Sequence, residues 1–283
     1  MIVRIIPLEP LHIGVKQVSG YEDIGADRVL HLPPPSTVLG ALASLLGRTD
    51  VDDPFEGLGC ERVWGPLVEI RGRRYFQSEG YLYAEEEVER YIKAVKSPAG
   101  ERPRRCCRLR EVVRPAVRLE EGKAARNLYF VKLTYVEGKE VSVGDVAYVY
   151  YVECKDVSAR REIARVGGEG RAAVVEIVND DFKPRVCREG VLLSPLLFYS
   201  EGPYAEVGRS EGLKELEEVY GVLAERWPPK VRSIYVGLGY SMSRNVRRAL
   251  YQALPPGTVV RLRNEASAAG LFAERGYGSL LCP

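Results

Sequence analysis

Runs of β-branched and aromatic residues mark several strands in the first part of the chain, because such side chains pack well on a pleated sheet. The clearest runs are LYFVKLTYV and VAYVYYVEC, which EGKEVSVGD would join as a hairpin. RVWGPLVEI and RRYFQ form a second pair around the tight turn Arg71-Gly72-Arg73. The pattern predicts strands at residues 1–8, 62–70, 73–77, 128–136, 146–154 and 171–178.

Three segments between these strands have apolar residues at helical spacing. In PPPSTVLGALASLLG, prolines precede Ser36 and Thr37, either of which can cap a helix that Gly47 ends. Residues 85–96 predict a short helix. Asp156 to Val166 predicts another, which a Gly-rich loop would stop.

The order of these elements indicates the fold class. Without the Arg-rich stretch, the first 180 residues follow β-α-β-β-α-β, the ferredoxin-like plan. The remainder repeats this plan more loosely, with strands at 190–198, 232–238, 258–263 and 277–281 and helices at 210–226 and 243–254. We therefore expect an α+β protein of tandem ferredoxin-like (RRM-like) halves. The first would span residues 1–180, with an insertion at about 80–127 and a Gly-rich loop at 167–170, and the second residues 181–283.

Composition narrows the class of protein only slightly. Hydrophobic residues make up 46% of the 283, enough to form a core. Lys and Arg total 41 against 39 Asp and Glu, so net charge neither supports nor excludes a nucleic-acid partner. The N-terminus lacks the pattern of a signal peptide, and no apolar run approaches the roughly 18 residues of a membrane span. We expect a cytoplasmic protein with no membrane partner.

Six cysteines lie scattered along the chain, and none forms a CxxC pair. With only His12 and His31 to add, they do not predict a metal site or a cofactor. The sequence does not indicate which of them would form disulfides. They are Cys60, Cys106, Cys107, Cys154, Cys187 and Cys282.

Positive charge is concentrated in one tract. Between residues 102 and 118, seven arginines face a single acid, Glu111. Guanidinium groups match phosphate geometry and stack on bases, so this tract is the best candidate for contact with nucleic acid. The alternative is a solvated loop whose arginines pair with the acidic stretch 85–89. The seven are Arg102, Arg104, Arg105, Arg108, Arg110, Arg114 and Arg118.

Two glycine-containing segments are further candidates. Gly167, Gly168 and Gly170 could expose backbone N–H groups to a phosphate, with Arg171 beside them. The alternative is a helix end followed by a tight turn. Near the C-terminus, Arg275 could reach a phosphate and Tyr277 could stack on a base, or this segment could be a bulged hairpin that returns to the sheet.

Several of these motifs, in this order, resemble the repeat-associated mysterious protein (RAMP) superfamily of CRISPR systems. The resemblance is to the Cmr-type subunit that caps the 5′ end of the guide RNA in type III-B effector complexes, with a type III-A counterpart or a divergent subtype left open. It covers most of the chain and rests on LPPPSTVLGALASLLG, GPLVEIRGRRYF, ARNLYFVKLTY, RVGGEGRAAV, LLSPLLF and ERGYGSLL.

The resemblance implies a non-catalytic subunit that binds the repeat-derived 5′ tag of the crRNA. It also implies contacts with the large polymerase-like subunit and with the adjacent backbone RAMP subunit. Carried over by motif, Gly167, Gly168, Gly170 and Arg171 would hold tag phosphates. Ser36 and Thr37 would add a helix N-terminus, and the Arg102–Arg118 tract would match a β-hairpin thumb.

Two other functions remain open on the sequence alone. One is a metal-independent endoribonuclease of the same superfamily that processes repeat RNA, with His12 as acid or base. The other is a scaffold whose contacts are mainly with proteins.

Overall fold

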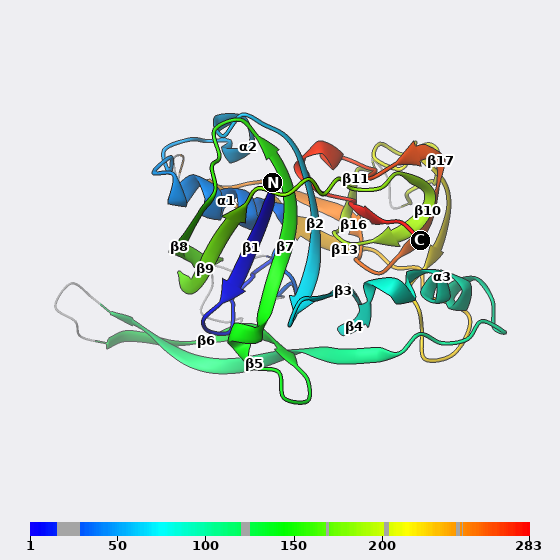
Figure 1. Cartoon of the computed structure of the whole chain (residues 1–283), viewed down its shortest axis with the longest axis horizontal. Helices are drawn as coiled ribbons and strands as arrows, with labels where there is room; N and C mark the ends of the chain where they lie inside the picture. The colour runs from blue at the N-terminus through cyan, green and yellow to red at the C-terminus, as the bar shows by residue number, and fades with distance from the viewer. Residues whose placement is uncertain (16–28, 120–124, 168–169, 201–203, 242–243, 245) are drawn as a thin grey trace.

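The fold is known from a computed structural model that describes residues 1–283 except 16–28, 120–124, 168–169, 201–203, 242–243 and 245. Antiparallel sheet dominates it, and the few helices lie against the faces of the largest sheet (Figure 1). The class is therefore α+β, as predicted.

The largest sheet has nine strands, all from the first 178 residues, in the order β6-β5-β4-β3-β2-β7-β1-β9-β8. Every neighbouring pair in it is antiparallel. The strands are β1 (Ile2–Pro7), β2 (Cys60–Ile70), β3 (Arg73–Ser78), β4 (Tyr81–Ala84), β5 (Arg105–Leu119), β6 (Ala125–Glu137), β7 (Val146–Cys154), β8 (Arg160–Val166) and β9 (Arg171–Val178).

Two predicted helices of the first half are confirmed. One is α1 (Pro35–Leu45), which packs its apolar residues into the core on one face of the sheet. The other is α3 (Val88–Lys96), which follows the 3₁₀ turn η1 (Glu85–Glu87). The short α2 (Pro54–Gly57) and the 3₁₀ turns η2 (Val143–Asp145) and η3 (Ala273–Arg275) complete the set.

The capping prediction for α1 was wrong. The N-cap residue is Pro34, with no side-chain cap hydrogen bond, and Ser36 and Thr37 lie within the first turn. Proline suits this position because its missing N–H would have no partner there.

The second face of the sheet is covered by α3 and by residues of the C-terminal part. The phenol of Tyr91 on α3 joins these layers, because its oxygen lies 2.6 Å from Ser78 Oγ, donates to Gly257 O at 2.9 Å and accepts from Leu223 N at 3.1 Å. The central strands of the large sheet are thus buried on both faces, as in other layered folds.

The C-terminal part contributes three small sheets, in the orders β12-β17-β10-β18, β11-β16-β13 and β14-β15. No α-helix occurs after Lys96 in the portion of the chain that the structure describes. The strands are β10 (Cys187–Leu192), β11 (Leu196–Phe198), β12 (Leu216–Gly221), β13 (Ile234–Gly237), β14 (Tyr240–Ser241), β15 (Val246–Arg247), β16 (Leu250–Leu254), β17 (Val259–Ala266) and β18 (Leu280–Leu281).

Three predicted helices were wrong. The segment 156–166 contains β8, 210–226 contains β12, and 243–254 contains β15 and β16. The predicted pairing of 128–136 with 146–154 was also wrong, because β6 pairs with β5 whereas β7 lies between β2 and β1. The tandem ferredoxin-like plan is therefore not confirmed, and the boundary at residues 180–181 stays a prediction.

Three disulfides pair the six cysteines, whose pairing the sequence did not indicate. Cys60–Cys154 joins opposed positions of β2 and β7, Cys187–Cys282 joins β10 to the C-terminal residues, and Cys106–Cys107 links neighbours in β5. Among the described residues, no helix is long and apolar enough to cross a membrane.

Candidate nucleic-acid interface

The first part of the arginine tract gathers around one aromatic ring at the start of β5. Strand pairing sets Tyr81 of β4 opposite Arg108 of β5. The Arg105 guanidinium lies 4.0 Å from the centre of the Tyr81 ring and that of Arg108 lies 5.5 Å from it. Such cation–π contacts order the arginines while leaving their N–H donors free for another partner. We call Arg104, Arg105 and Arg108, with Tyr81, the β5 cluster.

The cluster is exposed and short of counter-ions. Arg104, Arg105 and Arg108 are all exposed, and none forms an ion pair with a carboxylate of the residues that the structure describes. Arg105 donates only to Tyr83 Oη, at 3.3 Å. These guanidinium groups therefore keep most of their donors for a ligand.

The alternative pairing with the acidic stretch is not what the structure shows. Glu86 pairs with Arg73, Glu87 with Arg90 at 2.9 Å, and Glu89 with Lys93 at 4.0 Å. Basic residues of β3 and α3 thus pair with the acidic stretch, in place of the arginine tract.

Other arginines of the tract have partners. Arg110 binds Glu137 across the hairpin at 2.7 Å. Arg102 donates to the carbonyls of Ala224 and Glu225, at 3.2 and 2.5 Å, and so fastens the C-terminal part to the start of β5. The tract therefore divides into structural arginines and available ones.

Strands β5 and β6 form a long hairpin that projects from the body of the molecule (Figure 1). This agrees with the hairpin that the family resemblance implies for the arginine tract. Alternation along β5 sets Arg108, Arg110 and Arg114 on one face and Val113 on the other. Arg114 and Val113 are both exposed, so the hairpin has one basic face and one more apolar face.

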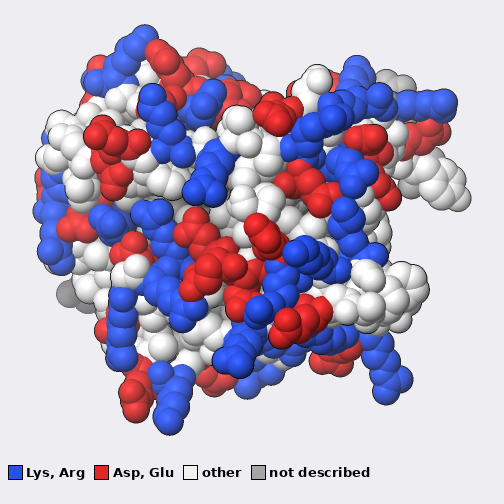
Figure 2. Space-filling model, turned by 45° about the vertical axis from the view of Figure 1, so that its right-hand side comes forward, with Lys and Arg blue, Asp and Glu red and all other residues white. Residues whose placement is uncertain are grey.

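Charge elsewhere is mixed. Figure 2 shows Lys and Arg side chains interspersed with Asp and Glu over the face it presents, without a broad field of one sign. Many of these side chains are ion-paired, for example Lys96 with Glu189 at 2.7 Å. Positive charge available to an RNA is therefore a local property of particular arginines.

The glycine loop is the turn between β8 and β9, not the end of a helix. Gly167 has a φ of +72° and lies so close to the chain that an added Cβ would be 2.4 Å from His12 O. Any other residue would therefore clash with backbone. Gly170 also has a positive φ, of +57°, and Gly168 lies outside the described residues.

Arg171, predicted to hold phosphate, is engaged by an acid. Its guanidinium binds Glu9 at 2.7 Å, and the same carboxylate accepts from Ala172 N at 3.0 Å. The backbone N–H of Ala172 and then Arg171 lower the pKa of Glu9 below its ordinary value. A phosphate would have to compete with this carboxylate.

His12 connects the glycine loop to the hairpin. It is 3% exposed, and its Nδ1 lies 2.8 Å from the carbonyl of Lys132 on β6. The loop, His12 and the hairpin are thus packed together, while His12 itself is enclosed. This geometry suits a structural histidine better than a general acid or base, which must reach its substrate.

The C-terminal candidates occupy interior positions. Tyr277 is 2% exposed, so its ring offers no face to a base. Burial raises its pKa to about 12, while the nearby polar groups of Ser36 act in the opposite direction. Ser36 and Tyr277 are therefore neighbours in the structure, beneath the N-terminus of α1, and we do not include Tyr277 in the interface.

Arg275 is held by acids. It pairs with Asp53, with Glu56 at 3.6 Å and with Glu274 at 3.4 Å. Its guanidinium also lies 5.1 Å from the ring centre of Phe55. These contacts tie the C-terminal segment to α2, a structural role.

The residues predicted for RNA binding therefore do not form one site. The β5 cluster lies at one end of the hairpin, and the glycine loop lies beside β6 further along it. Arg108 and Arg114 are six residues apart, or about 20 Å along a strand. Tyr81 was missed, because only the pairing of β4 with β5 brings it to the arginines. In the described part of the chain, no group of His, Cys, Asp or Glu is placed to hold a metal.

Comparison with known structures identifies the architecture. The fold is that of chains found in type III-B CRISPR complexes. Two of the similar chains come from cryo-EM structures of the type III-B Cmr-beta complex, one bound to cognate target RNA and one bound to cognate target RNA and AMPPnP. Their TM-scores are 0.64 and 0.62, and both are 18% identical to this protein over 92% of its chain and 86% of theirs.

Sequence comparison finds no such relation. No protein-family model matches the chain, and no curated protein matches it. The relationship is therefore evident in the fold and not in the overall sequence.

Proposed function

We propose that this protein is an RNA-binding subunit of a type III CRISPR effector complex, and that it holds the 5′ repeat-derived tag of the crRNA. The observation that carries the proposal is the fold likeness over 92% of the chain to chains of RNA-bound type III-B complexes. The sequence motifs add to it, because they resemble the subunit that caps the guide RNA. In this proposal the partners are crRNA, the large polymerase-like subunit and a backbone RAMP subunit. The two halves, 1–180 and 181–283, are modified ferredoxin-like units.

The β5 cluster is the best candidate for phosphate contact. Its arginines have no acidic partner in the part of the chain that the structure describes, and Tyr81 holds two of them in place. Arg114 and the N–H groups beside Gly167 and Gly170 would extend the path along the hairpin. Contacts of this kind bind the RNA backbone, with a strong dependence on salt.

We also propose that the protein does not cleave RNA. The enclosed position of His12 supports this, because a general acid or base needs access to the scissile phosphate. The runner-up, an endoribonuclease, would need His12 to become exposed.

Binding can be tested with the purified chain and fluorescent RNAs that carry or lack the repeat-derived 5′ segment. We expect anisotropy titrations to show tighter binding of the tagged RNA, and binding that weakens as salt rises. For variants in which arginines of the β5 cluster are replaced by Gln, Arg110→Gln serves as a matched control. Arg110 is on the same strand but is paired with Glu137. Equal affinity for both RNAs would contradict recognition of the tag.

Cleavage is tested separately, with end-labelled repeat RNA in the presence of EDTA. We expect the RNA to remain intact. Specific cleavage that disappears in His12→Asn, with the melting temperature retained, would establish the endoribonuclease instead.

A further inference from the structure

A cavity of about 520 Å³ lies where the N-terminal and C-terminal parts meet. Small-molecule sites in proteins typically measure about 300–1,000 Å³ and combine apolar walls with a few polar groups. Segments far apart in the sequence form this one: residues 29–34, Pro66 of β2, Gln77 of β3, and Arg232, Ile234, Tyr235, Leu250, Pro255 and Pro256 of the C-terminal part.

The walls are mainly apolar. Six prolines contribute to them, together with Ile234 and Leu250, and Tyr235 is half exposed among the lining residues. Apolar walls suit the faces of an aromatic ring, because those faces are then removed from water. The prolines are Pro33, Pro34, Pro66, Pro195, Pro255 and Pro256.

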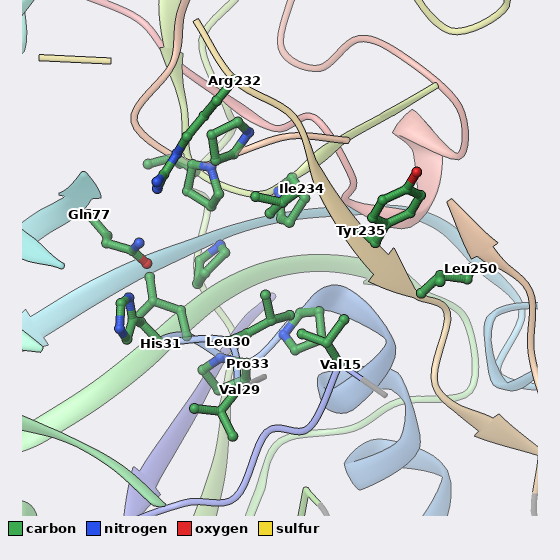
Figure 3. A pocket seen from close by; sticks show the side chains of 17 residues that line it. Val15, Val29, Leu30, His31, Pro33, Gln77, Arg232, Ile234, Tyr235 and Leu250 are labelled. Atoms are coloured by element: carbon green, nitrogen blue, oxygen red, sulfur yellow. The ribbon is translucent and has the colours of Figure 1, made fainter. Parts of the chain in front are cut away.

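The polar groups converge at one end. Figure 3 shows the amide of Gln77 between Arg232 and His31, directed toward the cavity. The Gln77 residue is only 8% exposed, and its side-chain amide forms no hydrogen bond with another described residue. The amide therefore has its donor and its acceptor available to a ligand in the cavity.

The two neighbours of this amide are already anchored. Nε2 of His31 faces Glu111 at 3.4 Å, which leaves Nδ1 as the other hydrogen-bonding atom of the ring. Arg232 pairs with Glu79 at 2.7 Å. Gln77 is therefore the unengaged member of the group, and it can donate and accept at the same time.

From this geometry we infer that the cavity binds a nucleobase, with a preference for adenine. A glutamine amide pairs with adenine by donating to a ring nitrogen and accepting from the amino group, whereas guanine presents two acceptors on its major-groove edge. Cytosine offers the same pair of groups as adenine, but its smaller ring buries less apolar surface against the walls. The base could belong to a bound RNA or to a free adenine nucleotide. The inference does not depend on the proposed tag binding, because a free nucleotide tests the cavity alone.

The test measures binding of AMP, GMP, CMP and UMP by calorimetry, and binding of a single-stranded U-tract RNA with or without one central adenosine. We expect adenine to bind at least tenfold more tightly than the other bases in one of the two formats. Gln77→Leu should remove that preference.

Gln252→Leu is the matched control, since Gln252 lies on β16 but does not line the cavity. A preference seen with AMP identifies a free nucleotide as ligand, and one seen only in RNA identifies an extruded base. The inference is overturned when neither format prefers adenine, or when Gln77→Leu leaves the preference intact. The all-U RNA reports on the arginines independently, so loss of the cavity's preference is distinguishable from loss of RNA binding.

Discussion

Two groups of arginines in this molecule differ in their exposure and in their ion pairs. Those of the β5 cluster are exposed and have no acidic partner among the described residues, and two of them lie over an aromatic ring. Arg171 and Arg275 are about three-quarters buried and bind carboxylates. A guanidinium that already binds a carboxylate contributes to the fold, whereas one without such a partner remains available to a phosphate.

This difference explains why glycine and arginine motifs alone did not locate the interface. Both groups look similar in the sequence, since each places arginine near glycine or aromatic residues. The distinction depends on Glu9 and Asp53, which are far from their arginines along the chain. Replacing the arginines of the β5 cluster is the strongest test of the difference between the two groups.

Replacing Arg104, Arg105 and Arg108 together with Gln should cause the largest change in RNA binding. We expect about a 100-fold loss of affinity, since each lost phosphate contact contributes about 1 kcal/mol. The slope of log affinity against log salt concentration should also become smaller by about 2. Anisotropy titrations at several salt concentrations measure both. An unchanged slope would show that these arginines do not contact phosphate.

Replacing Arg275 with Ala should lower the free energy of unfolding by about 2 kcal/mol, because it leaves Asp53 without its partner. RNA affinity should stay within about twofold of the original. Urea denaturation and the same anisotropy assay provide the two numbers. A stable variant with weak RNA binding would move Arg275 into the interface.

Arg171→Gln is expected to have an intermediate effect, a loss of about 1 kcal/mol of stability, because Glu9 keeps its hydrogen bond from Ala172 N. Its RNA affinity decides whether the Glu9 pair can open for a phosphate. A loss of more than tenfold would place the glycine loop on the RNA path, and a change below twofold would exclude Arg171 from it.

The smallest effect concerns pH. The pKa of Glu9 is lowered in the folded protein, from an ordinary value of 4.5, so its ionised form stabilises the fold above that pH. This contribution is lost as the pH falls through the folded pKa. Since Glu9 is partly exposed, we expect Glu9→Gln to cost only about 0.5 kcal/mol at pH 7 and less at pH 3. Denaturation curves at both pH values test this, and an equal cost at the two would refute it.

The strands of the first half were predictable because their apolar and aromatic runs are long and the alternation is regular. The strands that were not predicted have irregular burial or pairing in the sheet. β8 is an edge strand in which Ile163 is 71% exposed, so its burial pattern does not alternate clearly. In β12, irregularities between Leu216 and Glu218 and between Val219 and Gly221 shift the pairing, so buried and exposed residues do not alternate along the strand.

The candidate sites were predictable in part. The arginine tract and the projecting hairpin follow from the sequence and its family resemblance. The partners that occupy Arg171 and Arg275 do not, because strand order decides them. The cavity around Gln77 was missed entirely. The one available sign was a polar residue at an otherwise buried strand position in RRYFQS.

The two long-range disulfides have a consequence for how the chain responds to cutting. Cys60–Cys154 and Cys187–Cys282 span 94 and 95 residues and do not overlap. They convert most of the polypeptide into two successive covalent rings joined by residues 155–186. A protease that cuts once inside a ring opens it without releasing a fragment, whereas one cut between the rings separates the molecule into two pieces. Comparing digests on reducing and non-reducing gels would therefore reveal where the chain was nicked.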